Sequence, residues 1–302
     1  MNKKLKLATK LVMSMCIIGS LLVPVQAKAS TINTQSDNVT ANETKELMNK
    51  FPEFKESLKK YSSGKLVTRN ESYVKFIPKE NTKQSPQLRK AYNADTVKRD
   101  YEVQTFTKEE FQKEITKEQS RRAKRSIGGL QTNSCYWLKL DLQVYKGTNG
   151  CDYMAYNFCK WLTRPALRFQ DGIGISLSDG LIVSSNGNTR HAIYNFANPY
   201  SPDGGHNQLS VTINSHGNGV LATGYLARDF SSSFPNLKEY HEFMISTGVS
   251  YNNRSVNKGW ITGHYLHKQL AVGGIGMDIN GVPNLSIGGG KDTHSGSRFV
   301  SR

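Results

Sequence analysis

The composition of this chain of 302 residues changes abruptly at a run of basic residues, Arg121-Arg122-Ala123-Lys124-Arg125. After this run lie 24 of the 26 glycines, all three tryptophans and all seven histidines. The part up to Arg125 holds 26 of the 40 basic residues and 14 acidic residues, so it carries +12 of the formal net charge of +16. Two differently organised parts therefore meet at this run, and the chain cannot be interpreted as one uniform fold.

The basic run is also a candidate cleavage site. It is followed by small and flexible residues, Ser126-Ile127-Gly128-Gly129. A trypsin-like or furin-like protease requires an extended segment whose cationic side chains fill acidic subsites. A solvated charge run in a linker is the alternative explanation. Because the composition changes at the same place, we favour cleavage, with a recognition sequence formed by Arg121, Arg122, Lys124, Arg125 and Ser126.

Residues 1–29 have the pattern of a secretory signal peptide. Lys3, Lys4 and Lys6 precede an apolar run from Leu11 to Val25, and Ala27-Lys28-Ala29 then supplies the small residues that a signal peptidase requires. The apolar run is short for a transmembrane helix. We therefore expect a secreted, extracellular product.

Residues 30–125 are rich in charged and polar residues and contain Gly64 as their only glycine. Helical periodicity is present at 47–58 and 106–115, and residues 67–77 alternate as a strand does. A segment of this composition cannot bury a large core alone. We interpret it as a prosegment that folds on, or shields, the downstream domain; a poorly ordered spacer is the alternative.

Residues 126–302 are numerous enough for one compact domain, and strand patterns dominate them. Residues 137–145 alternate apolar and polar side chains, as in a half-buried strand, and Gly147-Thr148-Asn149-Gly150 ends that strand. Further strands are predicted at 173–177, 181–184, 191–196, 208–214, 220–227, 259–266, 269–279 and 284–287, with hairpin turns at 178–180 and 279–281.

Two segments of this domain have helical patterns instead. Residues 151–162 carry a broad apolar face and end before Pro165. Residues 236–246 have apolar side chains at helical spacing, with Pro235 near the start and Gly248 after the end. The predicted fold class is therefore α+β and mainly antiparallel β: a compact β-rich domain with one or two short helices.

Three cysteines remain beyond the signal peptide, so one disulfide would leave one thiol. In a helix over 151–162, Cys151 and Cys159 would be about 12 Å apart along the axis, too far to bond. We expect a bridge between Cys135 and Cys159, because Cys159 shares the apolar stripe of Ala155. The alternative pairs Cys135 with Cys151 and leaves Cys159 as a buried thiol.

Cys151 is also a candidate nucleophile. At the start of a helix it would feel the positive end of the helix dipole, which lowers the pKa of a thiol and favours the thiolate. His191 opens a predicted strand and could act as the base. Asn195, Asn198 or Asp203 could orient it, and we choose Asn198 as the candidate. The arrangement resembles the general pattern of papain-like thiol hydrolases and of protein deamidases, without the full motif of one family.

Other sites receive little support from the sequence. Residues 126–302 carry 14 basic and 10 acidic residues, a formal charge of +4 without a clustered stripe, so no dedicated nucleic-acid binding is expected. His206 and His216 in predicted turns could perform acid-base work on a phosphodiester, but no diagnostic cluster of lysine or arginine accompanies them. No cofactor and no metal site are predicted.

Three classes of function remain. The first is a secreted bacterial effector, a toxin or antimicrobial protein, made as an inactive precursor and activated by proteolysis after Arg125. The second is a secreted zymogen of a cysteine-dependent hydrolase or deamidase, and the third is a non-enzymatic extracellular binding module. The expected partners are a processing protease and an extracellular target protein, glycan or membrane surface.

We predict that the mature protein begins at or within a few residues of Ser126. Replacing Lys124 and Arg125 with alanine should leave an unprocessed precursor, because the protease loses the cations that it binds. Mass spectrometry of the secreted form would report the new N-terminus. A wild-type protein that is secreted intact and fully active would contradict this prediction.

Overall fold

The computed structural model describes residues 41–78, 101–125, 135–163, 170–178, 180–196, 205–214, 216–226, 241–253, 255, 257–268, 275–278, 280, 282–285 and 291–301. The predicted signal peptide (1–29), Ser126 and Asn198 lie outside these residues. Of the described helices, none is long and apolar enough to cross a membrane.

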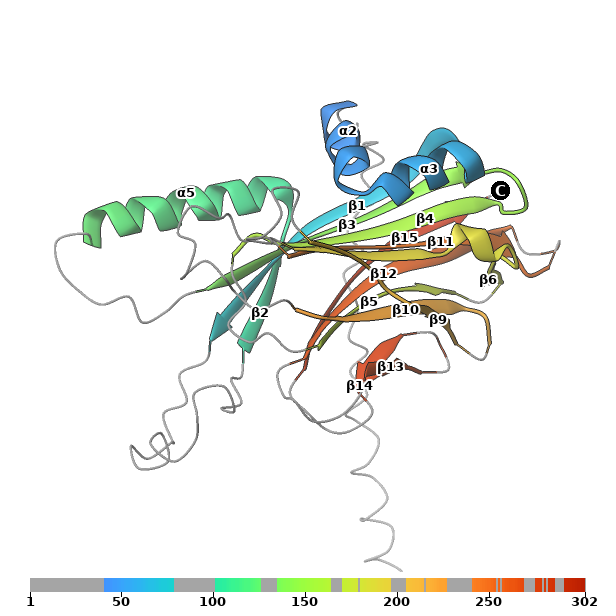
Figure 1. Cartoon of the computed structure of the whole chain (residues 1–302). Helices are drawn as coiled ribbons and strands as arrows, with labels where there is room; N and C mark the ends of the chain where they lie inside the picture. Colours follow the sequence, from blue (N-terminus) through green and yellow to red (C-terminus); the bar gives the residue numbers. More distant parts are fainter. Residues whose placement is uncertain are drawn as a thin grey trace, which may run out of the picture. The chain divides into compact units, whose positions relative to one another are not determined.

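In the described residues up to Arg125, the chain forms three helices and two strands (Figure 1). The helical periodicity at 47–58 is divided between the first two helices, and that at 106–115 covers the first half of the third. The first strand covers the alternating residues 67–77. Pro52 stands at the start of the second helix, where its missing N–H costs nothing. The elements are α2 (Ala41–Lys50), α3 (Pro52–Tyr61), β1 (Ser62–Pro78), β2 (Tyr101–Phe106) and α5 (Lys108–Arg125).

The part after the basic run is built of strands. In its described residues the only helical element is a short 3-10 turn, η2 (Gly187–Thr189). The strands are β3 (Tyr136–Gly147), β4 (Tyr153–Trp161), β5 (Gln170–Leu177), β6 (Leu181–Val183), β7 (His191–Phe196), β8 (Gly205–Gln208), β9 (Val211–Ile213), β10 (Gly219–Tyr225), β11 (His241–Tyr251), β12 (Lys258–Lys268), β13 (Ile275–Met277), β14 (Pro283–Leu285) and β15 (Lys291–Ser301).

The strands form two large antiparallel sheets and a small one. The first has the order β2-β1-β3-β4-β11-β7-β8, with β6 also paired to β11. The second has the order β15-β12-β5-β10-β9, and β13 pairs with β14. We call the first the large sheet and the second the five-stranded sheet. The predicted mainly antiparallel β architecture is confirmed.

Both helices predicted after the basic run are wrong. Residues 153–161 form strand β4, and residues 241–246 belong to strand β11. Nearly every residue of these two strands is buried, because one face packs between the sheets and the other lies under neighbouring elements. A strand buried on both faces loses the alternation of apolar and polar residues, and its continuous apolar run resembles a buried helix.

The turn predictions have mixed outcomes. The turn after Gly147 is the β3–β4 hairpin, where Asn149 and Gly150 have positive φ. β13 and β14 form the closing hairpin. The hairpin predicted at 178–180 is wrong, because β5 lies in the five-stranded sheet whereas β6 pairs with β11 of the large sheet.

The predicted disulfide is also absent: Cys135, Cys151 and Cys159 are all present as thiols. The strand register explains this. Cys159 pairs with Leu140, five residues beyond Cys135, so about 17 Å of strand separates the two cysteines. The alternative bridge from Cys135 to Cys151 would have to span the whole length of β3. Both separations exceed what a disulfide can close.

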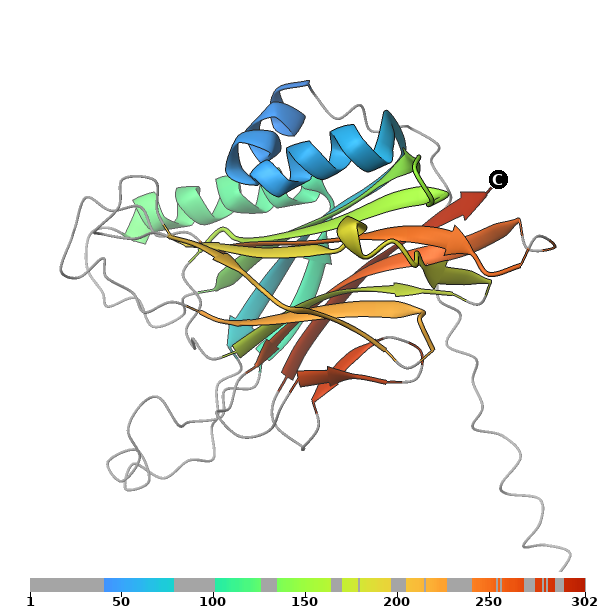
Figure 2. The ribbon, with the colours of Figure 1, turned by 45° about the vertical axis from the view of Figure 1, so that its right-hand side comes forward.

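Strand β1 joins the two parts of the chain. It lies inside the large sheet between β2 and β3, and eleven residue pairs, from Ser62↔Gly147 to Phe76↔Tyr136, connect it to β3. In Figures 1 and 2, α2 and α3 lie along the same side of this sheet. The segment before the basic run therefore folds on the downstream strands and completes their sheet.

Two apolar clusters stabilise this arrangement. The larger lies between the sheets and includes the residues of β3 that the alternation predicted to be buried: Leu138, Leu140, Leu142 and Val144. The second lies on the other face of the large sheet, under α3. There Phe54 is fully buried and makes edge contacts with Tyr156 and Phe158, at ring-centroid distances of 4.8 and 5.2 Å.

We predict that Phe54→Ala lowers the free energy of unfolding by about 3–5 kcal/mol, because it leaves a cavity under α3. Phe299→Ala is the matched control, since this ring on β15 is 42% exposed; its cost should be about 1 kcal/mol or less. Urea unfolding of the two variants would measure both values. Equal stability of Phe54→Ala and the wild type would show that α3 contributes little to the fold.

Candidate binding site

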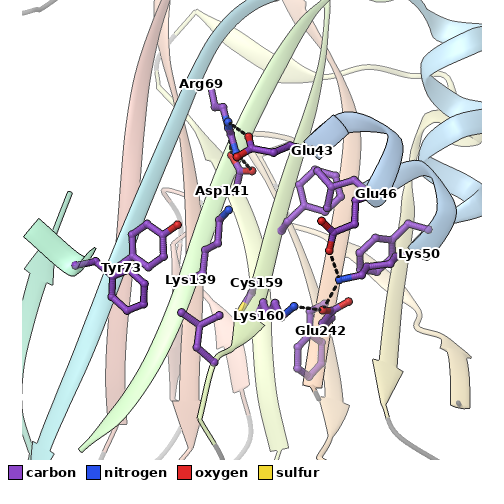
Figure 3. Close-up of a pocket in the computed structure, with 16 residues that line it drawn as sticks. Glu43, Glu46, Lys50, Arg69, Tyr73, Lys139, Asp141, Cys159, Lys160 and Glu242 are labelled. Carbon is purple, nitrogen blue, oxygen red and sulfur yellow. Dashed lines mark hydrogen bonds and ion pairs between the residues drawn. The ribbon is translucent and has the colours of Figure 1, made fainter. Parts of the chain in front are cut away.

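A cavity of about 350 Å³ lies between the helices of the N-terminal segment and the large sheet (Figure 3). Eight of its lining residues precede the basic run and eight follow it, so neither part of the chain forms it alone. The residues are Glu43, Glu46, Leu47, Lys50, Phe51, Arg69, Tyr73, Phe111, Lys139, Asp141, Phe158, Cys159, Lys160, Leu162, Glu242 and Phe243.

Arg69 of β1 is the centre of the first charged group in the cavity wall. Its Nε and Nη2 donate to the two carboxylate oxygens of Asp141 on β3, both at 2.7 Å. Nη1 donates to Glu43 of α2 at 2.8 Å, and Nη2 also contacts Glu71 at 2.7 Å. Lys139 completes the group with an ion pair to Glu71 at 3.0 Å. Three carboxylates thus hold one guanidinium, and the group connects α2, β1 and β3.

This packing shifts the acid-base behaviour of the group. Burial alone would raise the pKa of Glu43, but the hydrogen bonds from Lys108 and Arg69 outweigh it and lower the pKa to about 2. Burial also opposes the ionised form of Glu71, yet Tyr73, Lys139 and Arg69 bring its pKa below the ordinary value. Both carboxylates are therefore ionised at neutral pH.

A second charged group lies on the other side of the cavity. Lys50 of α2 contacts Glu46 at 2.8 Å and Glu242 of β11 at 3.0 Å. Glu242 also accepts from Lys160 of β4 at 2.9 Å. Burial opposes the charge of Lys50, but these carboxylates raise its pKa above the ordinary value. All eight charged residues of the wall are therefore held in ion pairs, four basic and four acidic.

The remaining wall is apolar and largely aromatic. Tyr73 of β1 stacks on Phe111 of α5 with ring centroids 4.2 Å apart and an interplanar angle of 11°. Phe51 and Phe158 meet from the two parts of the chain at 5.6 Å. Apolar walls with a few fixed polar groups are typical of sites that bind an uncharged organic group.

Cys151 and His191 lie outside this cavity. The Cys151 thiol donates to the carbonyl oxygens of Thr148 at 3.3 Å and Tyr61 at 3.7 Å. His191 Nε2 donates to the carbonyl of Asn188 at 2.9 Å. In the described part of the chain, the two side chains thus have separate hydrogen-bond partners.

The structure does not support the expected lowering of the Cys151 pKa by a helix dipole. Cys151 precedes strand β4, so no helix terminus lowers its pKa. Burial instead raises the pKa of this thiol above the ordinary value. Asn198 lies outside the described residues, and a catalytic role for Cys151, His191 and Asn198 stays an untested prediction.

The predicted cleavage residues Arg121, Arg122, Lys124 and Arg125 fall in the last turns of α5. A protease binds its substrate in an extended form, so the end of this helix has to unwind before cleavage.

The sequence did not identify the charged residues of the cavity. Lys139 and Asp141 occupy the polar face of β3, which was expected to be solvated, whereas Asp141 is in fact 3% exposed. One feature of the sequence could have indicated these ion pairs. The alternating residues of β1 include Arg69 and Glu71, whose charges are complementary to those of Asp141 and Lys139. No group of His, Cys, Asp or Glu among the described residues is arranged to hold a metal ion.

No family model matches this chain, and no curated protein matches its sequence. Among solved structures, it is similar to the collagen-binding subdomain of the Enterococcus faecalis surface protein ACE, with a TM-score of 0.28 and 7% identity over 52% of this chain and 90% of that one.

Two further structures show likeness at the same level. The collagen-binding domain of a Staphylococcus aureus adhesin has a TM-score of 0.26 and 8% identity, over 47% of this chain and 86% of that one. AvmM, which catalyses macrocyclization in alchivemycin A biosynthesis, has a TM-score of 0.23 and 9% identity, over 49% and 80%. TM-scores this low do not place the chain in a family.

We predict that the Cys151 thiol of the native protein reacts slowly with iodoacetamide near neutral pH, because its raised pKa leaves little thiolate. Cys159, which is 1% exposed, should be labelled only after unfolding. Mass spectrometry of the alkylated protein distinguishes the two sites. Rapid labelling of Cys151 at neutral pH would restore the case for an activated nucleophile.

Proposed function

We propose that this chain is an extracellular, non-enzymatic binding protein whose site is the cavity between the N-terminal helices and the large sheet. The observation that supports this most is the state of the cavity's charges, all of which are held in ion pairs. Charges fixed in this way shape and orient a site, whereas a catalytic base or nucleophile needs an accessible reactive form.

The ligand that fits this cavity is an uncharged apolar or aromatic group presented by an extracellular partner. Four acidic and four basic side chains leave the wall without net formal charge. A charged ligand would therefore lose its hydration without gaining an unpaired counter-ion, which is costly. An apolar group gains the contacts of the aromatic wall.

Proteolytic processing after Arg125 is the second part of the proposal. It is motivated by the composition break and by the basic run at the end of α5. The toxin or antimicrobial activity placed first among the sequence-based hypotheses has no supporting feature in the described residues, and we replace it with the binding module. The thiol hydrolase stays an untested alternative, and we place it after the binding module because Cys151 and His191 have separate hydrogen-bond partners.

Filling the cavity tests the binding site. Leu47 of α2 lines the cavity, so we expect Leu47→Trp to weaken binding of the neutral apolar dye Nile red by about tenfold or more, since the indole occupies the space. Asn49→Trp is the matched control, because Asn49 is an exposed residue of the same helix and does not line the cavity. Dye fluorescence gives the affinities, and thermal unfolding verifies that both variants fold.

Two results would count against the proposal. Equal dye binding by the two tryptophan variants would place the apolar site elsewhere. Failure of the wild-type protein to bind the dye at all would mean that the cavity does not accept an uncharged apolar group.

A further inference from the structure

We propose that cleavage after Arg125 yields two chains that remain bound, with the N-terminal segment, residues 41–125, as a stable subunit of the mature protein. The binding partner of the downstream domain is thus the N-terminal segment of the same precursor. For the natural protein, this inference rests on the proteolytic processing proposed above. The interface itself can be tested whether or not that processing occurs.

The first contribution to the interface is backbone pairing. β1 belongs to the N-terminal segment, yet it is an interior strand of the large sheet, and β3 is its partner over eleven residue pairs. Loss of the segment would leave β3 as an exposed edge with unpaired N–H and C=O groups. Such an edge is unfavourable and prone to aggregate.

The second contribution is the ion pair between Arg69 and Asp141, which lie on opposite sides of the cut. Arg69 is 7% exposed and Asp141 3% exposed, and two hydrogen bonds of 2.7 Å join them. Separating the chains would break both hydrogen bonds between these two residues, and Asp141 would lose its cationic partner. Breaking a buried ion pair by removing one partner is strongly destabilising.

Apolar contacts add a third contribution at both ends of the segment. Near its start, Phe54 of α3 packs against Tyr156 and Phe158 of β4. Near its end, Phe111 of α5 makes an edge contact with Trp137 of β3 at 5.0 Å. Aromatic contacts of this kind bury large areas and dominate the energetics of interfaces.

The end of α3 provides a fourth contribution. The last carbonyl groups of a helix have no partner within the helix. Here the carbonyl of Tyr61 accepts from the Thr148 N–H at 2.9 Å and from the Cys151 thiol at 3.7 Å. The Asn149 side chain donates to the carbonyl of Lys60 at 2.5 Å. The β3–β4 hairpin of the downstream domain thus caps a helix of the segment.

These contacts would keep the binding cavity intact in the cleaved protein. The cavity takes half of its lining residues from each chain, so a ligand can bind only while the two chains stay together. Cleavage then frees the end of α5 without opening the cavity. A ligand held by both walls should in turn slow the separation of the chains.

The experiment uses the full chain with the recognition sequence of a site-specific protease inserted between Arg125 and Cys135. After complete cleavage, we expect one peak in native size-exclusion chromatography, with the mass of the uncut protein by light scattering and both fragments on a denaturing gel. Two native peaks at micromolar protein concentration would overturn the proposal, and this result does not depend on any substitution.

Substitutions at the ion pair test its role. Asp141→Leu leaves the Arg69 charge buried without its main partner, so dissociation of the cleaved chains should become about 100-fold faster or more. The double variant Arg69→Met with Asp141→Leu removes both charges and should recover most of the retention. Glu109→Gln, at an exposed position of α5, is the control. Equal dissociation rates for the single variant and this control would show that the pair does not hold the chains together.

The two proposals fail in different ways. If the secreted protein is never cut but the engineered cut leaves a single peak, the processing proposal is wrong and the interface stands. If natural processing occurs and the fragments separate, the interface proposal is wrong.

Discussion

The buried ion pair of Arg69 and Asp141 is the interaction on which the rest of this structure depends. It joins β1 to β3, and through Glu43 it also attaches α2 to the sheet. A buried charge is tolerated only where its counter-charge is correctly placed, so the pair fixes the register of the two strands. The same register brings the polar faces of β1 and β3 under the helices and so creates the charged wall of the cavity.

Burial on both faces of the large sheet determined how much of the fold could be predicted. Strand β3 was found because its apolar and polar residues alternate in the sequence, although most of them are buried. β4 and β11 were mistaken for helices because α3 covers the face that would otherwise be polar. The missing information was not local. It lay in the amphipathic helix α3, far away in the chain, and the sequence of a strand does not show that a distant helix covers it.

The dependence on distant parts of the chain also explains why the candidate site was not predicted. Lys139 and Asp141 look like solvated residues within the sequence of β3, and Arg69 looks equally ordinary within β1. Their role depends on the pairing of two strands that are separated by 57 residues of chain. Cys151 attracted attention for the opposite reason: its residue type suggested chemistry, whereas its position at a strand start, against the carbonyl of Tyr61, makes it part of a helix cap.

The position of β1 inside the sheet has a consequence for how the protein can be renatured. In the uncut chain, the segment and β3 are tethered by a short connection, so their effective concentration is high and pairing is a unimolecular step. Once the connection is cut, the same pairing becomes bimolecular and depends on dilution. A cleaved molecule that unfolds under stress would therefore lose a strand that it cannot easily recover. The lifetime of the cleaved protein would be set by the rate of unfolding rather than by equilibrium stability.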